Sequence, residues 1–270
     1  MDKAPMTSAP PTSDTMRILI LGGTGEASTL SRSLAGRADL SVMLSLAGRT
    51  SSPKPEPVPT RSGGFGGVEG LASYLRAEAI THLIDATHPF AATISGHAER
   101  AAASAEVQLL AIRRPAWSRE PGDVWIEVDR MEEAVAALGA KPRRVFLTVG
   151  RQEAGVFAAA PQHAYLARTV EPLGGILPVP DLTALEARGP FDIASEVALM
   201  CASGTEVLVS KNAGGAATYG KIAAARSLGI PVVMVRRPGK PDVPSVPDAA
   251  AALRWLDRGA HAGPATLRAV

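Results

Sequence analysis

Short, fully apolar runs alternate along the chain with segments in which apolar residues recur at helical spacing. A run such as Ile18–Leu21 has no polar face, as in a parallel-sheet strand that helices cover on both sides. Strands are predicted at 18–22, 40–46, 81–85, 107–112, 124–128, 144–149, 165–170, 206–210 and 232–235. Helices are predicted at 27–34, 68–79, 131–138, 193–202, 216–228 and 248–257. This alternation predicts an α/β fold.

The segment 81–115 is similar to the segment 205–238. Each reads as a strand, a polar loop, an Ala-rich helix, a second strand and the tripeptide Arg-Arg-Pro. This internal repeat predicts two Rossmann-like, doubly wound parallel-sheet domains of related topology. Because ligands of such proteins bind between domains, an inter-domain cleft is expected as the site.

A connection containing Gly and Pro at 139–142 places the domain boundary. The prediction is an N-terminal domain over 16–140 and a C-terminal domain over 141–260. Residues 1–15 are rich in Pro, Ser and Thr, and they are predicted to form a disordered tail. They lack the apolar core of a signal peptide. No apolar run approaches the roughly 20 residues of a membrane span, so a cytoplasmic location without membrane contact is expected.

The amino-acid composition mainly excludes certain partners and kinds of site. The 270 residues are 46% hydrophobic and 20% charged, as in ordinary globular proteins. A net charge of +2 indicates neither a nucleic-acid nor a membrane partner. The single cysteine, Cys201, excludes an intramolecular disulfide and a cysteine-based metal cluster. No metal site is expected, and none of these quantities bears on the oligomeric state.

A glycine-rich turn, Gly22-Gly23-Thr24-Gly25-Glu26, joins the first strand to the first helix. A turn of this kind aims backbone N–H groups and a helix N-terminus at a phosphate. The position of the third glycine in the full dinucleotide fingerprint is Ser28. The turn predicts a dinucleotide site, with a plain strand-to-helix connection as the alternative.

The second strand ends in Ala47-Gly48-Arg49-Thr50. An Asp or Glu at this place binds the ribose 2′-hydroxyl of NAD, whereas an Arg suits the 2′-phosphate of NADP. No acidic residue lies nearby, so Arg49 and Thr50 predict that the coenzyme is NADPH. The alternative is an exposed loop arginine. The turn at 150–152 lacks the glycine triplet, and no second dinucleotide is expected in the C-terminal domain.

Polar residues follow the strand at 81–85. Asp85, Thr87 and His88 lie where parallel strands end at their carboxyl edge, which is where α/β folds place their sites. They are therefore candidates for function. In the alternative interpretation, His88 is a loop residue held before Pro89.

Taken together, these motifs resemble the precorrin-6A reductase family of cobalamin biosynthesis over about Arg17 to Arg258. The matching stretches are Ile20–Glu26, Ala47–Thr50, Asp85–Phe90, Gly150–Gln152 and Ser210–Gly215, with Lys221 and Arg237–Pro238 beyond them. A proline-rich insert at Pro53–Pro59 and the long N-terminal tail depart from the family pattern without touching these motifs. The resemblance implies a two-domain oxidoreductase. It would transfer hydride from NADPH to a double bond of a polycarboxylated, ring-contracted tetrapyrrole, giving precorrin-6B.

The resemblance also implies roles for individual residues. The coenzyme is expected to contact Gly22, Gly23, Thr24, Gly25, Glu26, Arg49, Thr50 and Thr87. The substrate is expected to contact Arg151, Gln152, Ser210, Lys211, Asn212, Gly214, Gly215 and Lys221, because its carboxylates need cations and N–H donors. Asp85, His88 and Lys211 are nominated as catalytic residues that deliver the proton accompanying the hydride, with water as the alternative donor. The alternatives are structural roles, in which Lys211 and Asn212 cap the following helix and Lys221 lies on a solvated helix face.

Three other functions compete with this one. A non-catalytic dinucleotide sensor would have no need of the Lys211 glycine loop or of Arg151. A short-chain alcohol reductase would need Tyr and Lys four positions apart, and Tyr219 and Lys221 have the wrong spacing. The reductase of the cobalt-containing form of the same tetrapyrrole would have much the same sequence, so this alternative stays open.

Overall fold

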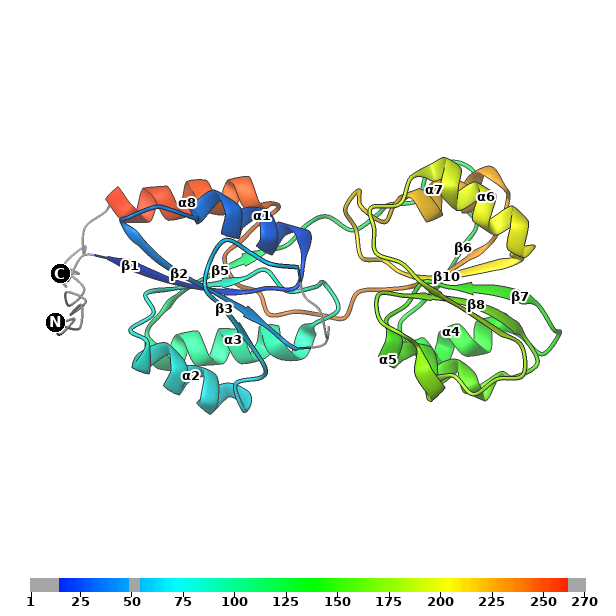
Figure 1. The fold of residues 1–270 in the computed structure, drawn as a ribbon, viewed down its shortest axis with the longest axis horizontal. Helices are drawn as coiled ribbons and strands as arrows, with labels where there is room; N and C mark the ends of the chain where they lie inside the picture. Colours follow the sequence, from blue (N-terminus) through cyan, green and yellow to red (C-terminus); the bar gives the residue numbers. More distant parts are fainter. Residues whose placement is uncertain (1–14, 49–53, 262–270) are drawn as a thin grey trace, which may run out of the picture. The chain divides into compact units, whose positions relative to one another are not determined.

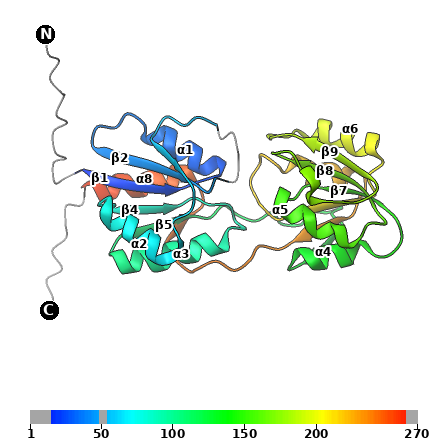
Figure 2. The ribbon, with the colours of Figure 1, turned by 60° about the horizontal axis from the view of Figure 1, so that its bottom comes forward.

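The computed structural model describes residues 15–48 and 54–261, which divide into two units. Unit 1 consists of residues 15–48, 54–113 and 240–261, and unit 2 consists of residues 114–239. Each unit is built on its own parallel β-sheet, with helices on both faces (Figures 1 and 2). The predicted α/β class with two Rossmann-like parallel-sheet domains is confirmed. The tail predicted at 1–15 lies almost wholly outside the described residues.

The sheet of unit 1 has the order β12-β5-β4-β1-β2-β3, and every neighbouring pair is parallel. Its strands are β1 (Met16–Leu21), β2 (Leu40–Leu46), β3 (Thr60–Ser62), β4 (His82–Asp85), β5 (Gln108–Ile112) and β12 (Ser245–Val246). Its helices are α1 (Gly25–Leu34), α2 (Gly67–Ala77), α3 (Ala92–Ala105) and α8 (Ala249–His261). Helices α1 and α8 cover one face, and α2 and α3 cover the other (Figure 1).

The apolar run of β1 shows why the sequence pattern predicts this arrangement. Ile18 and Ile20 point into the core beneath α1 and α8, whereas Leu19 and Leu21 point into the core above α2 and α3. All four side chains are buried, because alternate residues of a strand face opposite sides and both sides are covered.

The sheet of unit 2 has the order β6-β11-β10-β7-β8-β9, again parallel throughout. Its strands are β6 (Trp125–Val128), β7 (Arg144–Leu147), β8 (Ala164–Thr169), β9 (Leu182–Glu186), β10 (Val207–Lys211) and β11 (Val232–Val235). Its helices are α4 (Met131–Leu138), α5 (Arg151–Ala154), α6 (Ile193–Ser203) and α7 (Gly220–Ser227), with short 3₁₀ turns at Gly155–Ala159 and Gly174–Ile176. Helices α6 and α7 cover one face of the sheet, and α4 and α5 lie on the other (Figure 1).

The two sheets have the same strand order when β1 is matched with β7 and β4 with β10. The segments β4–α3–β5 and β10–α7–β11 then occupy equivalent positions. The related topology predicted from the internal repeat is confirmed by this order.

The chain exchanges one strand and one helix between the units. After β5 it enters unit 2, where β6 pairs with β11 and α4 follows. After β11 it returns to unit 1, where β12 pairs with β5 and α8 follows. The boundaries therefore fall at 113/114 and 239/240. The boundary predicted at 140/141 is wrong, because residues 114–140 complete the second sheet and the last helix completes the first unit.

Candidate functional site

The glycine turn of unit 1 has the geometry of a phosphate-binding turn. Thr24 is the N-cap of α1, and its Oγ1 accepts a hydrogen bond from the Ala27 N–H at 3.2 Å and donates one to the Ala86 carbonyl at 2.7 Å. A Cβ at Gly22 would lie 2.5 Å from Leu44 Cδ1, so a larger residue there would require the Leu44 side chain to shift. A Cβ at Gly23 or Gly25 would meet nothing within 4 Å, which leaves open space in front of the turn. The turn thus fits a dinucleotide phosphate at a helix N-terminus.

Ser28, in place of the third glycine, ties the proline-rich insert to the first helix. Its Oγ donates a short hydrogen bond to the carboxylate of Glu56, and Arg32 Nε lies 3.7 Å from the second oxygen of that carboxylate. The Glu56 side chain is 5% exposed. The described part of the insert therefore packs against α1. Arg49 and Thr50, the predicted readers of the 2′-phosphate, lie outside the described residues.

Asp85 is held in a saturated, buried network at the end of β4. Its carboxylate accepts hydrogen bonds from the hydroxyls of Thr87 and Ser95, each at 2.6 Å, and forms an ion pair with Arg113 at 2.7 Å. Burial raises its pKa, but the charge of Arg113 and these hydrogen bonds outweigh burial, so the pKa lies below its usual range. An ionised carboxylate with filled acceptors has no proton to give. The geometry contradicts the nomination of Asp85 as the proton donor.

His88 and Thr87 are braced by a lysine from the returning chain. Lys240 Nζ donates to Thr87 Oγ1 at 3.2 Å and to the His88 carbonyl at 3.0 Å. The His88 ring accepts a hydrogen bond from the Phe90 N–H at 3.2 Å through Nδ1. The alternative of His88 as a loop-holding residue before Pro89 thus has a geometric basis, while its half-buried ring keeps it a catalytic candidate.

In unit 2, the loop after β10 is shaped by the incoming chain. Asn212 Oδ1 accepts from the Trp117 N–H at 2.8 Å, and Asn212 Nδ2 donates to the Trp117 carbonyl at 2.9 Å. The indole Nε1 of Trp117 donates to the Gly215 carbonyl at 2.9 Å. Gly214 has φ +67°, and a Cβ there would lie 2.1 Å from the Pro115 carbonyl oxygen. Asn212 and Gly214 are therefore engaged with the incoming chain, and Asn212 does not cap the following helix.

The other predicted substrate residues lie in different environments. Lys211 Nζ forms an ion pair with Glu153 of α5 at 2.8 Å. Ser210 is fully buried, and its Oγ donates to the Lys211 carbonyl at 3.2 Å, so its predicted contact with substrate is contradicted. Arg151 and Gln152, at the start of α5, are exposed. Only these last two offer open side chains among the four.

Lys221 is buried, which contradicts the interpretation of a solvated helix face. It is 6% exposed, and its Nζ lies 5.7 Å from the centre of the Trp117 ring. Nearby, Arg168 forms a buried bidentate ion pair with Glu196, and its guanidinium stacks 3.7 Å from the Phe191 ring. Burial, followed by the charge of Arg168, lowers the pKa of Lys221 to about 7.

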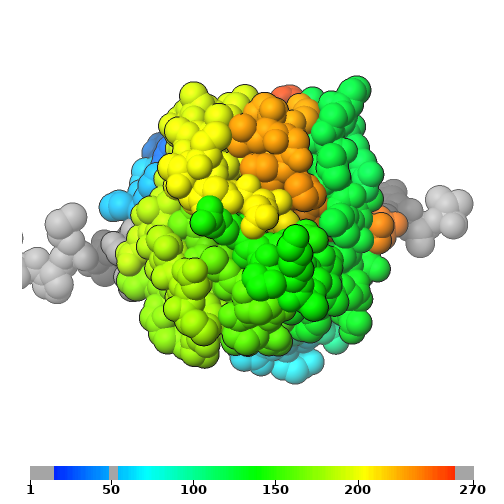
Figure 3. Space-filling model, turned by 90° about the vertical axis from the view of Figure 1, so that its right-hand side faces the viewer, coloured from blue at the N-terminus to red at the C-terminus, as the bar shows by residue number. Residues whose placement is uncertain are grey.

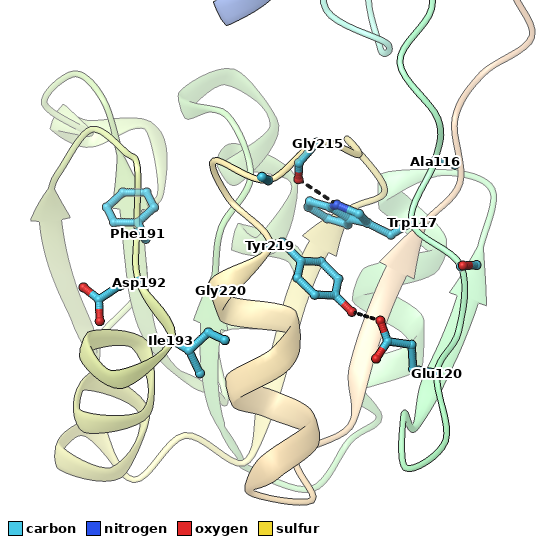
Figure 4. A pocket seen from close by; sticks show the side chains of 11 residues that line it. Ala116, Trp117, Glu120, Phe191, Asp192, Ile193, Gly215, Tyr219 and Gly220 are labelled. Atoms are coloured by element: carbon cyan, nitrogen blue, oxygen red, sulfur yellow. Dashed lines mark hydrogen bonds between the residues drawn. The ribbon is translucent and has the colours of Figure 1, made fainter. Parts of the chain in front are cut away.

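A pocket of about 650 Å³ opens in unit 2, and its lining includes Gly220, the residue before Lys221 (Figure 4). Its walls include Trp117, Glu120, Phe191, Asp192, Gly215 and Tyr219. They come from three segments, namely the incoming chain, the N-terminus of α6 and the loop leading into α7. Helices α6 and α7 lie side by side at the surface of this unit, as the yellow and orange residues of Figure 3 show. The pocket is aromatic, with charged groups at its edge.

The wall at Tyr219 is fixed by charged partners. The Tyr219 hydroxyl donates to Glu120 at 2.6 Å and accepts from Arg226 at 2.5 Å, and Arg226 also pairs with the buried Asp123. These contacts fasten the incoming chain to α7, since Glu120 and Asp123 belong to that chain.

The family model described as precorrin-6x reductase CbiJ/CobK matches residues 17–257. The chain belongs to this reductase family. It is 55% identical to a precorrin-6A reductase from Sinorhizobium sp. over 230 residues, which are 85% of this chain and 88% of the relative. It is 47% identical to the precorrin-6A reductase of Rhodobacter capsulatus over 245 residues, which are 90% of this chain and 97% of the relative.

A solved structure of a CobK precorrin-6A reductase shares the fold. It superposes with a TM-score of 0.85 at 45% identity and covers 95% of this chain and 100% of its own. As a precorrin-6x reductase, the chain is an oxidoreductase, and the alternative of a non-catalytic dinucleotide sensor is overturned. None of the helices in the described part of the chain has the length and apolar character needed to cross a bilayer.

Several residues around the pocket were not predicted from the sequence. Trp117, Phe191, Arg168 and Glu196 come from four separate segments and carry no local motif. For Trp117 and Phe191 the available signal is the scarcity of aromatic residues, 4% of the chain, which makes a half-buried one notable. Arg168 and Glu196 have no such signal.

Proposed function

We propose that this protein is a precorrin-6A reductase that transfers hydride from NADPH to a double bond of precorrin-6A, giving precorrin-6B. The observation that carries the proposal is the high identity to proteins of that name over nearly the whole of both chains. The open glycine turn of unit 1 supports it as a place for the coenzyme, and the aromatic pocket of unit 2, one wall of which contacts the buried Lys221, supports it as a place for the tetrapyrrole.

In this proposal the coenzyme binds to unit 1. Its pyrophosphate lies at the turn from Gly22 to Glu26, where the dipole of α1 favours negative charge. Arg49 and Thr50 bind the 2′-phosphate, which makes NADPH preferred over NADH. The nicotinamide supplies the hydride, and the protein supplies orientation. Thr87 is left out of the coenzyme contacts, since Asp85 and Lys240 already engage its hydroxyl.

The tetrapyrrole binds to unit 2. Its carboxylates interact with Arg151 and Gln152 on α5, with Lys211 and with the Gly215 turn, because charge-assisted hydrogen bonds are the strong ones for carboxylates. Lys211 exchanges part of its interaction with Glu153 for the substrate. The aromatic walls at Trp117 and Tyr219 accept the apolar surface of the macrocycle.

The test is an NADPH-oxidation assay of the purified protein with precorrin-6A, run beside the cobalt-containing form and beside NADH. We expect NADPH oxidation with precorrin-6A and a product that mass spectrometry finds to carry two more hydrogens. Absence of NADPH oxidation with either tetrapyrrole would contradict the proposed reaction. Faster turnover of the cobalt form would redirect the proposal to that substrate.

A further inference from the structure

The reduction of a conjugated double bond needs a proton as well as a hydride, and two of the three residues nominated for it, Asp85 and Lys211, are poorly suited. Asp85 is ionised with its acceptors filled, and Lys211 is paired with Glu153. The inference below rests on the proposed reductase function and concerns which side chain of unit 2 supplies that proton.

A cluster of five charged groups lies in unit 2, next to the pocket. Its cations are Arg168 on β8, Lys211 on β10 and Lys221 on α7, and its carboxylates are Glu153 on α5 and Glu196 on α6. Both nitrogens of the Arg168 fork bind Glu196, and Lys211 binds Glu153. The cluster is therefore one negative charge short of balance when every member is ionised.

Lys221 is the member without a carboxylate of its own. Among the described residues, the contact of its ammonium is with the Trp117 ring rather than with a carboxylate oxygen. An aromatic face attracts a cation electrostatically, but it does not provide the charge-assisted hydrogen bond that a carboxylate would. Since the residue is 94% buried, water compensates little for the missing partner. The ammonium proton is held more loosely than the protons of the paired cations.

Lys221 directly follows a pocket-lining residue and contacts one wall of the pocket. It follows Tyr219 and Gly220, which both line the cavity, at the start of α7. The Trp117 ring that it contacts and the Phe191 ring are both walls of the same cavity (Figure 4). The Phe191 ring also stacks on Arg168. Two members of the charged cluster, Lys221 and Arg168, thus contact the aromatic side chains that would hold a conjugated ring.

We propose that Lys221 is the general acid of the reduction. Its Nζ–H bond breaks, and the proton forms a C–H bond at the carbon conjugated with the one that accepts the hydride from the nicotinamide coenzyme. The hydride brings both electrons of the reduction, so the tetrapyrrole gains two hydrogens and the coenzyme is oxidised. Lys221 is left as a neutral amine and takes a proton from solvent before the next turnover.

The acid–base properties of the site agree with this role. The pKa of Lys221 lies at about 7, lowered by burial and by the charges of Arg168 and Lys211 and raised in part by Glu196. A general acid works best when its pKa is near the working pH. Because the acid form is lost as the pH rises through the pKa, kcat is expected to fall above about pH 7.

The test compares three variants of the full-length protein with NADPH and precorrin-6A. Lys221→Met removes the acid, Lys221→Arg keeps the charge but holds its protons too tightly to donate, and Lys141→Met changes an exposed lysine as a control. We expect both Lys221 variants to lose kcat by about 10²–10⁴-fold with a change in KM below about threefold, and the loss of activity above pH 7 to disappear. The control should retain the parent kinetics.

A role in anchoring a substrate carboxylate would give a different result. Lys221→Met would then raise KM with little change in kcat, and Lys221→Arg would restore the parent values. Either finding overturns the assignment. Thermal melting of each variant confirms that the comparison is made on folded protein.

A second measurement does not depend on turnover. In protein labelled with ¹⁵N-lysine, the resonance absent from Lys221→Arg identifies the Lys221 amine, and its titration should have a midpoint near pH 7. A midpoint near the ordinary value of about 10.4 would overturn the proposal. If the parent fails to oxidise NADPH with either tetrapyrrole, the proposed function fails and this role fails with it. A parent that turns over beside a fully active Lys221→Met contradicts the role of Lys221 alone.

Discussion

The loops after β4 and β10 occupy equivalent positions in two sheets of the same strand order, yet they have opposite chemistry. In unit 1 the central group is the carboxylate of Asp85, saturated by Arg113, Ser95 and Thr87. In unit 2 the loop begins at the half-buried Lys211 and lies near a buried lysine, Lys221. The same topology therefore supports a fully paired carboxylate in one unit and, in the other, a cluster with one more cation than carboxylates.

Both loops are also fastened by the chain that enters their unit. Lys240 holds the Thr87 and His88 segment in unit 1. The Trp117 backbone and side chain hold Asn212 and Gly215 in unit 2. The exchange of β6 and β12 between the units thus does more than complete two sheets, because each incoming segment also holds the loop after a central strand of the unit that it enters.

The largest expected effect on stability comes from removing the Asp85 carboxylate from its buried network of hydrogen bonds and an ion pair. Asp85→Asn should lower the free energy of unfolding by about 3 kcal/mol, because removing one member of a buried ion pair leaves its partner uncompensated. Urea denaturation at pH 7 measures it. Thr87→Val, which removes one hydrogen bond to the same carboxylate but keeps the ion pair, is the matched control and should cost about 1.5 kcal/mol. Equal stability of Asp85→Asn and the parent would show that Asp85 is not a structural anion.

The same network predicts that the stability contributed by Asp85 decreases at acidic pH. The pKa of folded Asp85 is lowered, so its contribution is fully present above the unfolded value of about 3.9. It is lost as the pH falls through the folded pKa. The stability difference between the parent and Asp85→Asn should therefore shrink progressively below about pH 4. A difference that stays constant down to pH 2 would contradict this linkage.

Next in size is the fastening of the second loop. Asn212→Ala should lower the free energy of unfolding by about 2 kcal/mol, because it removes two hydrogen bonds to the Trp117 backbone and leaves both groups unpaired. The tetrapyrrole should also bind more weakly, since Trp117 forms a wall of the pocket. Fluorescence titration with precorrin-6A measures the binding. If binding is unchanged in a folded variant, the incoming chain does not shape the substrate pocket.

A smaller effect is expected for the coenzyme side. Arg49→Ala should raise KM for NADPH about tenfold and leave KM for NADH unchanged, which corresponds to about 1.4 kcal/mol for a lost charged contact. Arg61, whose guanidinium bonds to Ser45 and the Gly63 carbonyl and stacks on Phe65, provides a contrast. Arg61→Lys should affect both coenzymes alike. Equal use of NADPH and NADH by the parent would refute the 2′-phosphate assignment.

The smallest effect is expected at the lysine that already has a partner. Lys211→Ala should weaken tetrapyrrole binding about fivefold, because a partly buried ion pair is exchanged for one with the substrate. Glu153→Gln, which frees Lys211 from its internal partner, should tighten binding instead. Unchanged affinity in both variants would remove Lys211 from the substrate site.

Much of the fold could be predicted from apolar runs and helical spacing, because these patterns depend only on residues within one strand or helix. Of the strands, β3, β9 and β12 were missed: β3 is a short polar strand at a sheet edge, β9 is half exposed, and β12 has two residues. The predicted helix at 216–228 begins only at Gly220, since the incoming chain holds the preceding loop in another conformation.

The candidate site was predicted unevenly for the same reason. The glycine turn, Asp85 and Lys211 follow strands directly, so their positions at the carboxyl edge were predictable. Their partners were not: Arg113 reaches Asp85 from 28 residues away, and Trp117 reaches Asn212 from 95 residues away. These partners turned Asp85 from a proposed acid into a structural anion, and Asn212 from a substrate contact into a brace.

The sequence by itself determined the strand-turn-helix units, the glycine turn and the family, because each depends on residues within one segment. Only the tertiary structure decided that β6 completes the sheet of unit 2 and β12 that of unit 1, and that Lys221 is a buried cation next to an aromatic pocket. Hydrophobic periodicity predicts that helices will cover a strand, but it does not predict which strand of which sheet it will pair with. Likewise, the charge state of a lysine depends on its burial and on neighbours that come from distant parts of the chain.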